Sequence, residues 1–146
     1  MADAVRIDGP PREVGPSRVF LVLYLTFAIG AGARSAVQLI TRAAHAPLAF
    51  TLSALAAVIY TVGLVLLARW GHGAARRAMW ILCWVELSGV IVVGSLSLAR
   101  PDLFPEATVW SAFGRGYLFI PAVLPVVVML WLRRSALATR PHAELA

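Results

Sequence analysis

The stretch that decides the fold is WVELSGVIVVGSLSLA, residues 84–99, which is apolar except for its serines and one acid, Glu86. The apolar character continues back along the chain, so the uninterrupted segment covers residues 78–99. A helix over this segment is ~33 Å long at about 1.5 Å per residue, enough to cross the ~30 Å hydrocarbon core of a bilayer. Pro101 and Pro105 follow and end the helix. The segment therefore predicts a transmembrane helix that carries an acid.

Three further apolar segments surround this one. Residues 18–40 and 47–69 are long enough to span a membrane, and the second begins at a proline, which favours the first turn of a helix. The stretch ATVWSAFGRGYLF, residues 107–119, is expected to be amphipathic or re-entrant. A shorter fourth segment, roughly 117–132, could begin as early as Trp110 and contains two prolines where we expect a kink. The mean hydropathy is +0.81 and 14% of the residues are charged, against about 25% in a soluble domain. We predict an all-α polytopic membrane protein with four transmembrane helices in an antiparallel bundle.

Polar segments lie at both ends of the chain. Residues 1–17 are predicted to be a disordered cytoplasmic tail, residues 18–134 the four-helix transmembrane domain, and residues 135–146 a second cytoplasmic tail. Cytoplasmic flanks of membrane proteins are enriched in Lys and Arg. Nine of the thirteen arginines fall on the side that both tails share with the loop at 69–77, and four on the other side. We therefore predict a multi-pass plasma-membrane protein with both termini in the cytoplasm.

Glu86 lies about nine residues beyond Arg77, hence ~13 Å into the membrane from the cytoplasmic side. An ionised carboxylate at that depth costs several kcal/mol unless it is paired or hydrated, so the side chain must point inward or be protonated. Small neighbours one turn away, among them Cys83 and Gly89, would admit another helix or a ligand. Glu86 is either a proton-coupling or cation-binding acid or a structural carboxyl bonded to a neighbouring hydroxyl or arginine.

A second polar group recurs at a spacing of four residues on the first segment, at Arg34, Gln38 and Arg42. Arg34 could reach towards Glu86 if the helix tilts or a water lies between them, and Arg115 is a competing partner. Alternatively, the arginines mark the external membrane interface and the first span ends earlier.

Small residues also repeat every four positions, which lets helix backbones approach closely. On the second segment these are Ala49, Ser53, Ala57 and Thr61; on the first they are Ala28, Gly32 and Ala36, and Gly89 stands on the third. We predict that these seams pack within the bundle, or that one of them forms a homo-oligomer or docks on a larger membrane complex.

Several chemistries are disfavoured by what the sequence lacks. Cys83 is the single cysteine, the three histidines fall in loops or tails, and no HExxH motif or pair of intramembrane acids is present. The net charge of +6 comes from arginines at the ends of apolar segments rather than on one polar face, so nucleic acid is not an expected partner. We predict no enzyme activity, no metal and no cofactor, with the lipid bilayer as the partner.

Three runs of the sequence, AIGAGARSAVQLITR, APLAFTLSALAAVIY and LARPDLFPEATVWSAFGRGYLFIPAVLP, resemble the small four-helix conserved integral membrane proteins of actinobacteria. The resemblance covers residues 18–134. It implies membrane location and fold only, because that group has no assigned activity. Small multidrug transporters and fluoride channels fit less well, since the first segment has no glutamate and the chain has no asparagine.

The leading functional hypothesis is therefore an accessory or scaffold subunit of a membrane complex. The alternative is a small oligomeric transporter or channel in which Glu86 is a proton- or cation-linked carboxylate. A third hypothesis, an enzyme acting on lipid at the outer face, lacks an identifiable nucleophile. Its residues would be Arg34, Arg115, Asp102 and Glu106.

Overall fold

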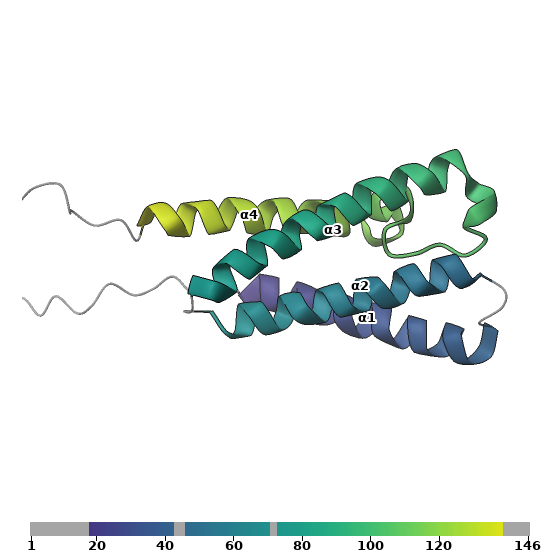
Figure 1. Cartoon of the computed structure of the whole chain (residues 1–146), viewed down its shortest axis with the longest axis horizontal. Coiled ribbons are helices and arrows are strands. Elements are labelled where there is room, and N and C mark those ends of the chain that lie inside the picture. The colour runs from purple at the N-terminus through teal and green to yellow at the C-terminus, as the bar shows by residue number, and fades with distance from the viewer. Residues whose placement is uncertain (1–17, 43–45, 71–72, 139–146) are drawn as a thin grey trace, which may run out of the picture.

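The computed structural model describes residues 18–42, 46–70 and 73–138 of the chain. Within them every regular element is helical (Figure 1): α1 (Arg18–Arg42), α2 (Pro47–Ala68), α3 (Gly73–Ala99), the short 3-10 helices η1 (Pro101–Leu103) and η2 (Ser111–Tyr117), and α4 (Ile120–Ala138). The prediction of an all-α chain is confirmed for these residues. The predicted tail at 1–17, and residues 139–146 of the second tail, lie outside the described residues.

The long helices lie side by side in two pairs (Figure 1). α1 packs along α2, α3 packs against both η2 and α4, and α2 also contacts α3. Three helical segments are long and apolar enough to cross a membrane: Arg18–Gln38 of α1, and the whole of α2 and α3. η2 and α4 are long and apolar enough only when taken together, and they are bent by 94° relative to each other. The structure therefore has three candidate spans, or four if this bent pair counts as one.

The first three helices agree with the sequence-based boundaries. α2 begins at Pro47, as predicted, because the fixed φ of proline suits the first helical turn and its missing N–H leaves no hydrogen bond unmade. α3 begins at Gly73 and therefore takes in the arginines at 76 and 77, which the sequence placed in the preceding loop. Hydrophobicity alone marks the membrane-embedded part of a helix, not the turn that extends beyond it.

The prediction of a single fourth helix over 117–132 is wrong at both ends. Ala112, Phe113 and Gly114 have positive φ angles, as do Leu118 and Phe119, so the backbone turns sharply before α4 begins at Ile120. A Cβ atom on Gly114 would also lie 2.9 Å from the ring of Pro121, so this position requires glycine. α4 then continues to Ala138, past the predicted domain boundary at 134.

The break therefore falls before the two prolines of α4, although we expected a kink at them. Pro121 is the second residue of the helix and Pro125 lies inside it. η2 is tied to α3 instead, since the Ala112 N–H donates a hydrogen bond of 2.8 Å to Ser97 Oγ. The direction of the chain at this point is set by tertiary contact rather than by proline.

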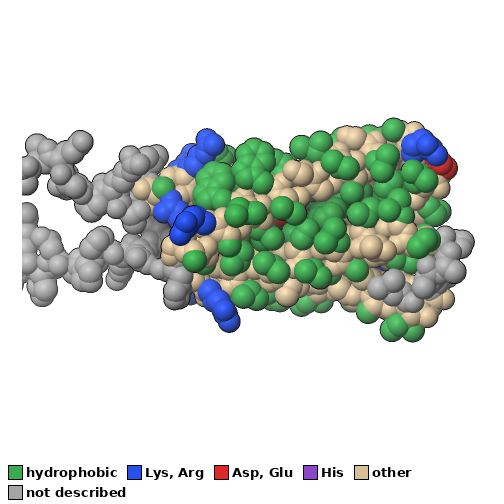
Figure 2. Space-filling view, in the orientation of Figure 1, with side chains coloured by type: hydrophobic (Ala, Val, Ile, Leu, Met, Phe, Trp, Pro, Cys, Tyr) green, Lys and Arg blue, Asp and Glu red, His purple; other side chains and the backbone are tan. Residues whose placement is uncertain are grey.

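Large apolar side chains cover the outside of the helices as well as the interior (Figure 2). Tyr24, Tyr60 and Trp110 are buried, whereas Ile81 and Val92 of α3 are more than half exposed. A soluble protein rarely exposes continuous apolar surface on this scale. This pattern is typical of a protein whose surroundings are themselves apolar.

Candidate functional site

Glu86 lies on the inner face of α3 with no exposed surface. The Tyr24 hydroxyl, from α1, donates a hydrogen bond of 2.9 Å to Glu86 Oε2. The predicted inward orientation is confirmed. Of the two kinds of partner predicted for a structural carboxyl, the hydroxyl is confirmed and the arginine is wrong: neither Arg34 nor Arg115 forms an ion pair with Glu86 within the described residues.

Two more aromatic side chains close the site around this carboxylate. Trp110 Nε1 donates a hydrogen bond of 3.2 Å to the Tyr60 hydroxyl, and Tyr60 lies within electrostatic reach of Glu86. The Tyr24 and Tyr60 rings meet edge to face, with centroids 5.9 Å apart. We call Glu86, Tyr24, Tyr60 and Trp110 the Glu86 cluster; its members come from α1, α2, α3 and the residue that precedes η2.

One polar atom of the Glu86 cluster has no hydrogen-bond partner among the described residues. Glu86 Oε1 is buried and has no hydrogen-bond partner in the described part of the chain. The Tyr60 hydroxyl already accepts the Trp110 N–H, so its own proton is available to an acceptor. The cluster therefore binds one oxygen of the Glu86 carboxylate through Tyr24 and leaves the other without a partner in the described residues, out of contact with the outside.

Glycines make room for the rings of this cluster. A Cβ atom on Gly89 would lie 2.9 Å from the Trp110 ring, and one on Gly63 would overlap the Tyr24 ring. A Cβ on Gly94 would come within 2.8 Å of the Phe113 backbone nitrogen. The small residues near Glu86 thus admit aromatic side chains from elsewhere in the chain, where the sequence predicted a helix or a ligand.

The second polar group forms a separate site, which we call the Arg34 corner: Arg34, Gln38 and Glu106. Arg34 Nη2 lies 3.5 Å from Glu106 Oε2, and each side chain is about one-third exposed (31% and 32%). Arg34 Nε and Gln38 Oε1 are buried atoms without a hydrogen-bond partner in the described residues. The side chain of Arg42, the third predicted member of this stripe, lies outside the described residues.

The acids and arginines proposed for a lipid enzyme do not come together as one set. Asp102 is bound by Arg100 through hydrogen bonds of 2.9 and 2.8 Å, and both side chains are more than half exposed. Hydrogen bonds from Arg100 hold the pKa of the Asp102 carboxyl below its usual value. Arg115 is exposed and has no ion pair in the described part of the structure.

The small-residue seams are correct only in part. Ala49 and Ser53 are each 1% exposed, and a Cβ on Gly32 would lie 4.0 Å from the Cβ of Ala57, so α1 and α2 do approach closely there. Ala28 packs against the same core. Thr61, however, is exposed and donates a hydrogen bond of 2.7 Å to the Ala57 carbonyl, so it does not belong to the seam.

The sequence analysis missed Tyr24, Tyr60 and Trp110. A hydroxyl or indole N–H inside an apolar segment needs a hydrogen-bond partner, and that requirement is the signal that could have found them. Within the described residues, His, Cys, Asp and Glu side chains form no group of three or more that could hold a metal ion. No family model, curated protein or solved structure matches this chain.

Proposed function

We propose that this chain is a multi-pass membrane protein without catalytic activity that serves as an accessory or scaffold subunit of a membrane complex. The observation that carries the proposal is the closed state of Glu86: its carboxylate has no exposed surface and is bound by Tyr24 of another helix. A carboxylate that couples transport must be reached by water or ions. A dry hydrogen bond between helices instead fixes how those helices pack.

The arrangement of charge supports a membrane-spanning antiparallel bundle with cytoplasmic termini in the plasma membrane. Basic side chains gather at one end of the molecule, with apolar side chains between the two ends (Figure 2). Exposed arginines stand at the helix ends that meet on the left of Figure 1: Arg18, Arg69, Arg77, Arg133 and Arg134. This is the asymmetry expected of a cytoplasmic face. The likeness to actinobacterial four-helix proteins remains a prediction.

Two exposed serines on the outer face of α3 support the proposal that a partner subunit packs there. Ser88 and Ser95 are exposed and one heptad apart, hence on the same side of the helix. The exposed threonines at 26, 51 and 61 each donate to a carbonyl of their own helix, whereas Ser88 and Ser95 have no hydrogen-bond partner in the described residues. A hydroxyl that faces lipid gains a partner when another helix covers it. We propose that a helix of a second copy, or of a larger complex, covers this face.

The test places a photo-crosslinking amino acid at Ser88 or Ser95, with Val58 as the matched control on the exposed face of α2, where it is 59% exposed. We expect cross-linked species in membranes from positions 88 and 95 and none from position 58. A lone monomer from every position, together with a lone monomer in mild detergent, would refute the scaffold proposal.

Transport through Glu86 is the second candidate, and the unpartnered Oε1 atom is the observation that favours it. In proteoliposomes, Glu86→Gln would abolish a coupled proton or cation flux, because the amide cannot exchange a proton. Flux carried equally by the unmodified chain and the variant would remove this candidate. A flux lost only in the variant would displace the scaffold proposal.

A further inference from the structure

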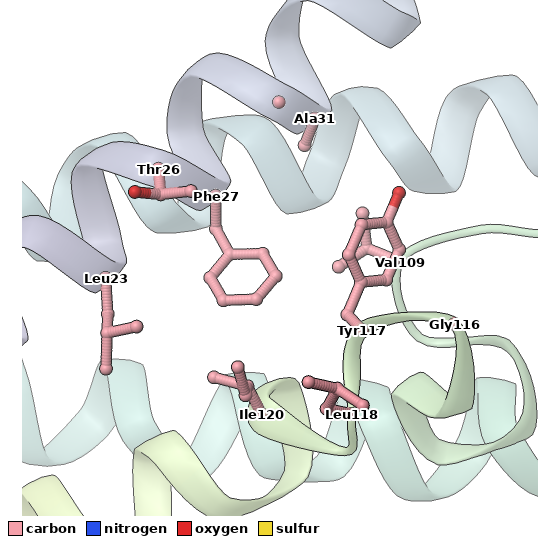
Figure 3. A pocket seen from close by; sticks show the side chains of 10 residues that line it. Leu23, Thr26, Phe27, Ala31, Val109, Gly116, Tyr117, Leu118 and Ile120 are labelled. Carbon is pink, nitrogen blue, oxygen red and sulfur yellow. The ribbon is translucent and has the colours of Figure 1, made fainter.

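A lateral pocket of about 350 Å³ opens between α1 and the segment that joins η2 to α4 (Figure 3). This volume is within the range of ligand-binding pockets, about 300–1,000 Å³. Its α1 wall is formed by Leu23, Thr26, Phe27, Gly30 and Ala31, and its other wall by Val109, Gly116, Tyr117, Leu118 and Ile120. Apart from the Thr26 and Tyr117 hydroxyls, the lining side chains are apolar, and the Thr26 hydroxyl is already bonded to the Val22 carbonyl.

Glycine keeps both walls of this pocket open. A Cβ atom on Gly30 or on Gly116 would meet no atom within 4 Å. The floor is Phe27, whose ring stacks on Tyr60 with a centroid separation of 5.1 Å and so separates the pocket from the Glu86 cluster. Leu118 stands at the opposite side, 83% exposed and in a left-handed conformation with a φ of 55°. The pocket therefore opens outward, away from the Glu86 cluster.

Polar side chains lie beyond one end of the pocket's apolar lining. The α1 lining residues follow one face of the helix, and the next position on that face is Arg34, one turn beyond Ala31. On the other wall, Glu106 lies three residues before Val109. The Arg34–Glu106 ion pair of 3.5 Å thus joins the two walls beyond the apolar part. The unpartnered Arg34 Nε and Gln38 Oε1 atoms belong to this same end.

We propose that this pocket binds one glycerophospholipid, with an acyl chain in the apolar part and the phosphate at Arg34. The α1 wall from Leu23 to Ala31 is ~12 Å long at about 1.5 Å per residue, close to the ~15 Å depth of one leaflet. The Arg34 side chain is about one-third exposed (31%) and makes a single Nη2 contact to Glu106, so its guanidinium keeps further N–H donors for a phosphate oxygen. The inference rests on the chain spanning a membrane, and it is independent of the scaffold role.

The test measures lipid retained by the purified full chain, by native mass spectrometry from mild detergent. Gly30→Leu fills the pocket at a position where no neighbouring atom obstructs the new side chain. Ala36→Leu adds the same side chain at an exposed position of α1 that does not line the pocket, and is the matched control. We expect about tenfold lower phospholipid occupancy for Gly30→Leu and unchanged occupancy for Ala36→Leu. Equal occupancy in both variants and the unmodified chain would overturn the proposal.

The headgroup is tested on the unmodified chain with a phospholipid and a diacylglycerol that carry the same acyl chains. We expect roughly tenfold stronger retention of the phospholipid, and we expect Arg34→Gln to remove that difference. Equal retention of the two lipids by the unmodified chain would overturn the phosphate site, whether or not the Arg34 variant folds. Cross-linking from Ser88 and Ser95 is scored separately, so a failure of the scaffold proposal is distinguishable from a failure here.

Discussion

Two acid-bearing sites of this chain, the Glu86 cluster and the Arg34 corner, differ in how each acid is partnered. Glu86 is fully buried and bound by a neutral tyrosine from another helix, whereas Glu106 is one-third exposed and 3.5 Å from an arginine. Burial of an ion pair costs more than its attraction returns unless the geometry is very good. Among the described residues, the interior between the helices therefore uses hydrogen bonds from aromatic side chains, and both ion pairs have partly exposed side chains.

The two sites also differ in whether their polar groups can be reached from outside the protein. In the Glu86 cluster, three ring-bearing partners and adjacent glycines leave a single atom unbonded, and the outside has no access to it. In the Arg34 corner, the paired Arg34 and Glu106 side chains are about one-third exposed (31% and 32%), so molecules from outside can reach them. We therefore expect substitutions in the cluster to change stability, and substitutions in the corner to change binding.

The largest expected effect is that of Glu86→Ala. The variant loses a fully buried side chain and leaves the Tyr24 hydroxyl without its acceptor, so we expect a loss of about 2–5 kcal/mol in the free energy of unfolding. Glu86→Gln keeps an acceptor oxygen and the side-chain volume, and should cost less than about 1 kcal/mol. Chemical unfolding in detergent micelles compares the two. Equal losses would show that charge, rather than the hydrogen bond, stabilises this site.

A smaller effect is expected for Gly89→Ala. The added methyl group would lie 2.9 Å from the Trp110 ring and must displace it. Overpacking of this kind costs about 1–3 kcal/mol. Gly30→Ala is the matched control, since its methyl group meets no atom within 4 Å and the better helix propensity of alanine should raise stability by up to ~1 kcal/mol. The same unfolding assay measures both, and a stabilising Gly89→Ala would contradict the packing of Trp110.

Glu106→Gln should have little effect on stability. The ion pair is partly exposed, and such pairs contribute about 0–1 kcal/mol. Its contribution should shrink in 1 M salt, where the Debye length is ~3 Å. Unfolding of the variant and the unmodified chain at low and high salt measures this. A loss as large as that of Glu86→Ala would show that the two sites are not different in kind.

The smallest effect is expected for the exposed Arg100–Asp102 pair. Because Arg100 lowers the pKa of Asp102 in the folded chain, its contribution to stability is present above the usual aspartate pKa of about 3.9 and is lost as pH falls through the lower folded value. Asp102→Asn should therefore lower the unfolding midpoint slightly and by a constant amount between about pH 5 and 7, and the difference from the unmodified chain should vanish as the pH falls through the lower folded pKa. A difference that appears only below about pH 4 would contradict this sign.

The features of the fold that could be predicted are those that depend on residues close together in the sequence. Pro47 and the apolar run behind it place α2 from local sequence alone, and the start at Pro47 is correct. The burial of Glu86 was equally predictable, because a lone acid in an apolar helix cannot face lipid. Its partner was not, since Tyr24 is 62 positions away in the sequence and the pairing depends on how α1 and α3 pack.

The course of the chain from η2 to α4 could not be predicted from the local sequence. Gly114 and Gly116 indicate a turn, but positive φ angles at Ala112, Phe113, Leu118 and Phe119 run against the preferences of those residues. Such conformations occur where surrounding contacts impose them. The amphipathic or re-entrant stretch expected before the fourth span is a bend of 94° between η2 and α4, whose course the local sequence did not specify.

That bend bears on the order in which the chain is built. Each left-handed residue other than glycine costs about 1–2 kcal/mol, and the cost is offset only once Gly94 and Ser97 of α3 receive the segment. We expect a cysteine at Ala112 to become protected from thiol reagents late in a series of ribosome-bound nascent chains, after α4 has emerged; protection before that point would contradict this order. The bent η2–α4 segment is then placed by docking on a helix that has already formed, rather than by its own hydrophobicity.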